Sequence, residues 1–150
     1  MAAFFAFLHH LAAFSLFAAL VVELVLVREA LTVAIARKIR IADLVFGVSA
    51  GVLLAVGFMR VFYFEKGATY YFQTWTFIAK LSLFVIVGLL SIIPTVEFLS
   101  WRKAVKQGQA PNVEAARIRS LRSIIHLELA GVALILLMAA LMAKGVGLML

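Results

Sequence analysis

The chain has 150 residues, of which 66% are hydrophobic and 14% charged, and its mean hydropathy is +1.15. A water-soluble domain of this length does not need so many apolar residues to fill its core, so the composition excludes that class and indicates a lipid bilayer as the solvent. The net charge of +7 does not indicate nucleic acid, because the basic residues are sorted by loop. The absence of cysteine excludes disulfides and thiolate metal sites.

Four apolar stretches, at about 3–27, 41–63, 75–99 and 121–143, are each long enough to cross a hydrocarbon core of about 30 Å as an α-helix. They lack the strict alternation of apolar and polar residues that the strands of a membrane β-barrel require. The sequence therefore predicts an all-α integral membrane protein, a single transmembrane domain over residues 1–150 that forms a four-helix bundle.

The basic residues predict the orientation of this bundle. Ten of the 14 lie in two alternate loops, at 28–40 and 100–122. By the positive-inside rule both loops face the cytoplasm, which places the N-terminus, the C-terminus and the 64–74 loop outside. We therefore expect a multi-pass protein of the bacterial inner membrane. Its expected partners are the lipid bilayer and a homodimer mate or a larger membrane complex, and no nucleic acid is expected.

Small and polar residues at helical spacing predict which faces of the helices pack together. The predicted stripes are Asp43, Gly47, Ala50, Leu54, Gly57 and Val61 in span two, and His126, Ala130, Ala133, Leu137 and Ala140 in span four. In span three the shared face consists of Lys80, Phe84, Val87, Ser91 and Pro94. Gly47 and Gly51 also form a small-xxx-small pair. Pro94 frees the carbonyl of Leu90, for which the Ser91 hydroxyl is the expected partner.

Ionisable side chains within a span are costly in lipid, and here they fall into two layers. The inner layer consists of Glu23, Asp43, Glu97, His126 and Glu128. Asp43 lies near the interface and is expected to cap a helix start. We expect Glu97 and Glu128 to pair with basic loop residues. Glu23 and His126 lie at similar depth, so we expect them to satisfy each other and to serve packing more than chemistry.

The outer layer consists of His9, His10, Arg60 and Lys80. No acidic residue in the outer half of the spans balances these groups, and the nearest one, Glu65, is in the loop. Two cations and two histidines without an internal counter-ion predict that an anionic or electron-rich ligand completes the site.

Helical geometry separates the two adjacent histidines. His9 shares a face with Leu16, Leu20 and Glu23, which suits the inside of the bundle. His10 lies about 100° round the helix, on the face of the bulky Phe14 and Phe17. We therefore expect His9 to point inward and His10 to point towards lipid or a neighbouring protein.

Short motifs around these residues resemble a known superfamily. They are His9-x7-Phe17-Ala18-Ala19-Leu20, Gly57-x2-Arg60 and Trp75-x4-Lys80-Leu81. Together they resemble the superfamily that includes copper-resistance protein D and the HemJ-type protoporphyrinogen oxidases. The run Arg60-Val61-Phe62-Tyr63-Phe64-Glu65-Lys66-Gly67 is similar to a branch of small predicted bacterial four-helix membrane proteins, and that similarity covers nearly the whole chain.

HemJ-type proteins are thought to bind b-type haem and to oxidise a porphyrinogen, with a His in the first span and a Lys in the third. The resemblance therefore implies haem b as the cofactor, with His9 and Lys80 in these two roles. Our leading hypothesis is a haem- or porphyrin-binding redox protein. His9 is its candidate axial ligand, and Lys80 and Arg60 are candidate catalytic residues that also bind propionates or substrate carboxylates.

Two alternatives remain open at this stage. One is a non-catalytic subunit or scaffold, whose glycine stripes dock a larger membrane complex. The other is a small metal-ion transporter in which His9, His10, His126 and Glu23 are the candidate metal ligands. The sequence leaves open whether the protein is an enzyme.

Overall fold

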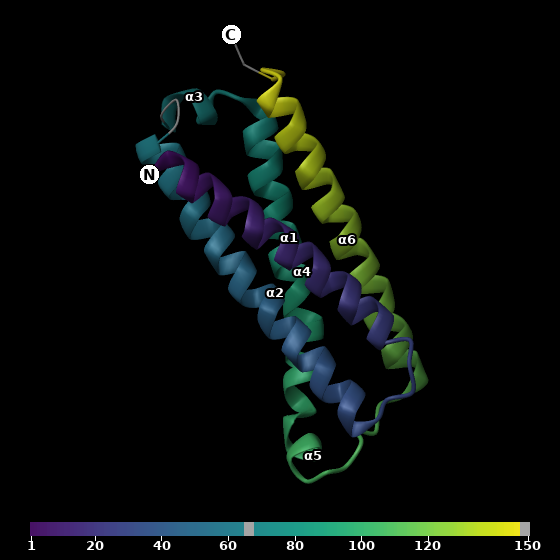
Figure 1. The fold of residues 1–150 in the computed structure, drawn as a ribbon. Coiled ribbons are helices and arrows are strands. Elements are labelled where there is room, and N and C mark those ends of the chain that lie inside the picture. Colours follow the sequence, from purple (N-terminus) through teal and green to yellow (C-terminus); the bar gives the residue numbers. More distant parts are fainter. Residues whose placement is uncertain (65–67, 148–150) are drawn as a thin grey trace.

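The computed structural model describes residues 1–64 and 68–147, and Figure 1 shows their arrangement. Its four long helices are α1 (Ala2–Leu26), α2 (Val33–Met59), α4 (Trp75–Ser100) and α6 (Ala115–Ala143). The shorter elements are a π-helical turn, η1 (Arg60–Phe64), and the helices α3 (Ala68–Phe72) and α5 (Arg102–Lys106). We call the end of the bundle where α1 begins and α6 ends the terminal end. The opposite end, which holds α5 and residues 27–32, is the basic end (Figure 1).

All four long helices are long and apolar enough to cross a membrane. The predicted all-α fold is therefore confirmed, and the chain is a multi-pass membrane protein with four candidate spans. In lipid this solution satisfies every backbone group within its own segment, which neither loops nor open strands achieve.

The second helix begins earlier than the apolar pattern predicts. It starts at Val33 rather than near residue 41, because the Thr32 hydroxyl accepts a hydrogen bond from the backbone N–H of Ile35 at 3.2 Å. The prediction that Asp43 caps this helix is therefore wrong. Asp43 lies well inside α2 and is buried.

The bundle consists of two closely packed helix pairs. Contacts are most extensive between α1 and α2 and between α4 and α6, whereas α2 and α4 touch sparsely. A looser seam therefore runs between α2 and α4.

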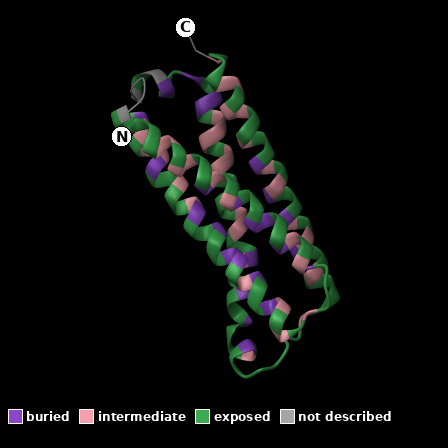
Figure 2. Cartoon of the chain, in the orientation of Figure 1, coloured by how far each residue is buried: buried purple, intermediate pink, exposed green. Residues whose placement is uncertain are grey.

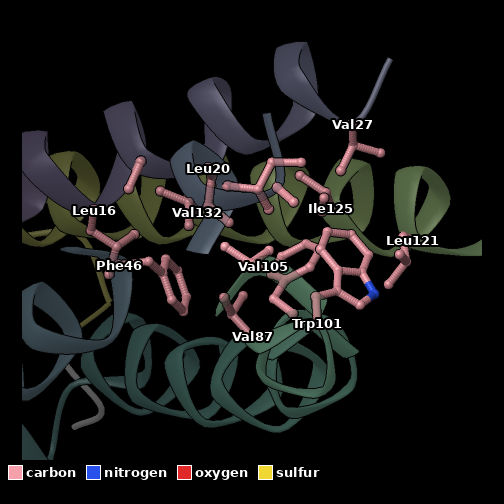
Figure 3. Close-up of a cluster of buried hydrophobic side chains, with 14 residues drawn as sticks. Leu16, Leu20, Val27, Phe46, Val87, Trp101, Val105, Leu121, Ile125 and Val132 are labelled. Atoms are coloured by element: carbon pink, nitrogen blue, oxygen red, sulfur yellow. The ribbon is translucent and has the colours of Figure 1, made fainter. Parts of the chain in front are cut away.

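A continuous hydrophobic cluster joins the pairs. Its side chains include Leu16 and Leu20 from α1, Phe46 from α2, Val87 from α4, and Ile125 and Val132 from α6 (Figure 3). Exposed residues cover much of the outward surface of the helices (Figure 2), where the bilayer would be. Because hydrocarbon surrounds these outer faces, close packing rather than exclusion of water holds the helices together.

The predicted small-residue face of α2 is only partly correct. Asp43 and Val61 are buried, but Gly47 and Leu54 are exposed. Gly51 is also exposed, and a methyl group added to Gly47 or Gly51 would meet no atom within 4 Å.

In α6 the predicted stripe faces away from the bundle. Its members His126, Ala130, Ala133, Leu137 and Ala140 are all exposed. The buried residues of α6 are instead Leu121, Ile125, Glu128 and Val132. The close approach of α6 to α4 occurs at Gly131, where an added Cβ would lie only 2.5 Å from Cγ2 of Val87. The close contact between α4 and α6 therefore lies at Gly131, and the alanine stripe takes no part in it.

The predicted inward face of α4 is confirmed. Val87 and Pro94 are buried, and Lys80, Phe84 and Ser91 are partly buried. The Ser91 hydroxyl donates to the carbonyl of Gly88 at 2.7 Å, rather than to the carbonyl that Pro94 frees.

We expect Gly131→Ala to destabilise the bundle by about 1–3 kcal/mol, because Val87 is β-branched and has little rotamer freedom with which to yield. Gly51→Ala is the matched control, and it should be neutral or slightly stabilising because alanine favours a helix and the space is open. Thermal unfolding of the two purified variants in detergent measures the difference. Equal melting temperatures for both variants would contradict the close α4–α6 contact.

Candidate functional site

A cavity of about 560 Å³ lies in the terminal half of the bundle, and residues of all four long helices line it. Most of its lining is apolar, such as Phe46, Leu53, Phe84 and Val132. The polar side chains that line it are His9, His10, Arg60, Tyr71, Lys80, Ser91 and Thr95. Because α2 and α4 touch sparsely, their seam leaves the space for this cavity. An apolar cavity of this size with a few polar groups is typical of a binding site for a small molecule.

His9 is half-buried and lies against α2. A Cβ added to Gly57 would lie 3.5 Å from Cε1 of His9, so the absence of a side chain at Gly57 makes room for the imidazole ring. In the described part of the chain, Nδ1 of His9 is buried and has no hydrogen-bond partner. His9 thus brings an uncompensated polar atom to the cavity wall, which is costly in an apolar environment.

His10 differs from its neighbour as the helical geometry predicts. Its side chain is exposed, and its Nδ1 lies 2.7 Å from the carbonyl oxygen of Ala6, to which it donates within the same helix. Phe14 and Phe17, on the same side of α1, are exposed as well. His9 therefore lies on the inward side of α1, whereas His10 lines only an exposed part of the cavity and is hydrogen-bonded within its own helix.

Arg60 and Lys80 reach the same cavity from α2 and α4. Arg60 follows the last residue of α2 and opens the π-helical turn, a feature that often marks functional sites in helices. Both cations interact electrostatically with His9. The Nζ of Lys80 lies 5.3 Å from the centre of the Phe77 ring, a cation–π geometry that holds the side chain at the cavity wall. The structure thus brings His9, Arg60 and Lys80 together, whereas Glu65 lies outside the described residues.

The other predicted histidine site does not form. Nδ1 of His126 lies 2.7 Å from the carbonyl oxygen of Arg122, to which it donates, and its Nε2 lies 3.3 Å from Nη2 of Arg28, from which it accepts. Both ring nitrogens of His126 are therefore engaged, and the predicted pairing with Glu23 is wrong. Helix geometry placed the two residues at similar depth but did not decide the direction from which each faces the other.

The candidate metal ligands His9, His10, His126 and Glu23 are not gathered into one site. Within residues 1–64 and 68–147, no three histidine or carboxylate side chains converge closely enough to hold a metal ion. This distribution offers no coordination sphere for a divalent cation, which requires several ligands at about 2 Å.

The acidic residues divide into a paired and an unpaired group. Glu97 accepts from Arg117 at 2.8 Å and from the indole N–H of Trp101 at 3.2 Å, so its predicted pairing with a basic loop residue is confirmed. Glu128 is fully buried, and neither of its oxygens has a hydrogen-bond partner among the described residues. The same prediction is therefore wrong for Glu128, because its side chain faces the bundle interior rather than the loops.

Thr95 is a polar residue of the site that the sequence reasoning missed. Its hydroxyl donates to Oδ1 of Asp43 at 2.6 Å, across the seam between α4 and α2. The available signal was its position four residues after Ser91, on the face of α4 that was correctly predicted to point inward.

Comparison with known proteins identifies one match. The profile of a family described as "Predicted membrane protein (DUF2214)" matches residues 1–147. No curated protein and no solved structure matches the chain. The match covers nearly the whole chain and agrees with the four candidate spans, and it does not extend to copper-resistance protein D or to the HemJ-type oxidases.

We expect Thr95→Val to destabilise the protein by about 1–3 kcal/mol, because valine preserves the shape but leaves a buried carboxyl oxygen of Asp43 without its donor. Thr95→Ser retains the hydroxyl and should lose less. The midpoints of thermal unfolding of both variants, measured in the same detergent, test this. If the valine variant is as stable as the serine variant, the hydrogen bond to Asp43 contributes little.

Proposed function

We propose that this chain, which belongs to the DUF2214 family of predicted membrane proteins, binds an apolar ligand that carries carboxylates, of the b-type haem or porphyrin class. The binding site is the cavity of the terminal half. The observation that carries the proposal is the gathering of His9, Arg60 and Lys80 at the wall of an otherwise mainly apolar cavity of about 560 Å³.

The chemistry of the lining supports this class of ligand. A porphyrin has a broad apolar ring and two carboxylates, so it needs an apolar enclosure with cations at its edge. Guanidinium and ammonium groups bind carboxylates through charge-assisted hydrogen bonds, and Arg60 and Lys80 supply one of each. Imidazole is a common ligand of haem iron, and His9 supplies one at the wall of the same cavity.

Each residue has a distinct role in this proposal. His9 would bind the iron of a haem, and its packing against Gly57 holds the imidazole ring in position. Arg60 and Lys80 bind and orient the carboxylates, and they set the direction in which the ligand enters. When bound, haem supplies one-electron redox chemistry, so the redox role of the protein depends on this cofactor.

The proposed orientation places this site near the outer surface of the membrane. Ten of the 14 basic residues lie at or near the basic end of the bundle. The positive-inside rule assigns that end to the cytoplasm. Arg60 and Lys80, which line the cavity in the terminal half, then lie towards the outer side of a bacterial inner membrane, where a ligand could reach them without crossing the bilayer.

A scaffold role is the second candidate, and the exposed glycines of α2 favour it. Gly47 and Gly51 are four residues apart and open to their surroundings, which suits close approach of a helix from another protein. The outward stripe of small residues on α6 offers a further face of this kind.

An absorption spectrum of the protein from haem-supplied cells tests the leading proposal, which predicts a Soret band. His9→Ala should lower the affinity for haem at least about tenfold, equivalent to about 1.4 kcal/mol, while binding of iron-free protoporphyrin persists. Lys80→Ala and Arg60→Ala should weaken both ligands, because they act on the carboxylates. Spectral titration with each ligand measures these affinities.

His10→Ala is the matched control, because His10 is adjacent to His9 but exposed and bonded within its own helix. This variant should bind haem almost as well as the unchanged protein. Loss of haem binding in His10→Ala with full binding in His9→Ala would overturn the assignment. A purified, folded protein that shows no Soret band and binds neither ligand would favour the scaffold role.

Single cysteines test the orientation, because the natural chain contains none. Thr69 and Gln109 are exposed at opposite ends of the bundle. An impermeant maleimide added to intact cells should label Thr69→Cys and leave Gln109→Cys unlabelled until the membrane is permeabilised. The reverse pattern would place the basic end outside.

A further inference from the structure

Each of the four long helices contributes one polar side chain to a cluster in the basic half of the bundle. We call Glu23, Asp43, Thr95 and Glu128 the carboxyl layer. Thr95 donates to Asp43 at 2.6 Å, and the carboxyl group of Asp43 interacts electrostatically with those of both Glu23 and Glu128. The two glutamates do not belong to the site proposed above, because neither lines that cavity, and only Thr95 of the layer lines it.

The two glutamate side chains are buried more deeply than ionisable side chains usually are. Glu23 is 1% exposed and Glu128 is 0% exposed. In the described residues, Oε1 of Glu23 and both oxygens of Glu128 are buried without a hydrogen-bond partner. An ionised carboxylate in such a place costs several kcal/mol unless a cation or several donors compensate it. A protonated carboxyl group avoids most of that cost, because it carries no net charge.

Two of the cations near the layer, Arg28 and Arg117, are paired with other groups, whereas the Nε atoms of Arg40 and Arg122 are buried without a hydrogen-bond partner in the described residues. On α6, the backbone carbonyl of Arg122 binds His126, whose other ring nitrogen accepts from Arg28, which follows α1. The ion pair of Arg117 is with Glu97 of α4.

On α2, Arg40 interacts electrostatically with Asp43. Asp43 therefore has both a nearby cation and the Thr95 hydroxyl. Within the described chain, no salt bridge joins Glu23 or Glu128 to a cation. Glu23 and Glu128 are repelled by Asp43 and have no salt bridge among the described residues, so protons are the remaining means of neutralising them.

A second cavity borders the carboxyl layer at Asp43 and Thr95. Its volume is about 440 Å³, and Arg40, Asp43, Gly47 and Thr95 are among the residues that line it. Gly47 and Thr95 line the larger cavity as well, so the two cavities adjoin at these residues. Asp43 thus stands between the second cavity and the two enclosed glutamates.

We propose that Glu23, Asp43 and Glu128 form a proton-binding site, in which the two glutamates hold exchangeable protons and Asp43 admits them from the second cavity. A hydronium ion at Asp43 transfers its proton to a carboxylate oxygen, an O–H bond forms, and water is released. No electron moves in this step. The proton-binding site needs no ligand in the larger cavity. This proposal can therefore be tested independently of porphyrin binding.

Dicyclohexylcarbodiimide tests this proposal, because it enters the bilayer and reacts with protonated carboxyl groups in apolar surroundings. The full-length protein in phosphatidylcholine vesicles is treated over a range of pH, and the adducts are mapped by mass spectrometry. Glu128 or Glu23 should be labelled several-fold more than Glu97, and the labelling should fall as the pH rises. Glu97 is the internal control, because its carboxylate is bound by Arg117.

Glu128→Gln should fold normally, because an amide resembles a protonated carboxyl group in size and charge, and it should remove the label at that position. Infrared spectroscopy gives a second readout, which can also be recorded on the unsubstituted protein. The carboxylic C=O band should shift in heavy water, and it should diminish in Glu128→Gln but persist in Glu97→Gln. If neither glutamate is labelled and the band is absent, the proposal is overturned. Protection from labelling by sodium ions at constant pH would also overturn it, because the site would then hold a metal cation.

Discussion

An apolar solvent forces each polar side chain of this small bundle either to reach an end of the membrane or to find its partner among the other helices. Backbone groups meet this demand by forming α-helices, whereas side chains must meet it through the packing of one helix on another. Glu97 meets it at the basic end, where Arg117 binds it. Glu128 cannot do so, because it faces the interior. The polar groups that remain inside therefore define where chemistry can occur.

Those interior groups separate by charge along the bundle. His9, Arg60 and Lys80 surround the cavity of the terminal half, and the carboxyl layer lies in the basic half. The hydrophobic cluster extends from the cavity past the carboxyl layer, since it includes Leu16 and Val87 at the cavity wall and Trp101 and Leu121 near the basic end (Figure 3). At the loose seam between α2 and α4, the two cavities adjoin at Gly47 and Thr95. The proposed carboxylate-binding site and the proposed proton site thus adjoin one seam of the fold.

The different outcomes for α1 and α6 show when sequence reasoning succeeds. On α1, the exposed Phe14 and Phe17 lie on the opposite side from the buried Leu16 and Leu20. The pattern therefore correctly placed His10 on a different side from His9. On α6, the spacing of the alanines predicts the packing face, but apolar side chains of any size are stable against lipid. Small residues permit close contact without requiring it. The contact formed instead at Gly131, where the facing residue is Val87.

The sequence by itself determined the number of long apolar helices, their approximate bounds and the inward side of α1 and α4, because length, hydropathy and helical spacing are local properties. Depth along each helix also follows from the residue count, so the separation into two ionisable layers was accessible in advance. Only the tertiary structure decided which groups within a layer meet. Glu23 faces Asp43 and Glu128 rather than His126, and Thr95 reaches Asp43. These pairings depend on how each helix is rotated against its neighbours, and packing at single contacts such as Gly131 and Gly57 sets that rotation.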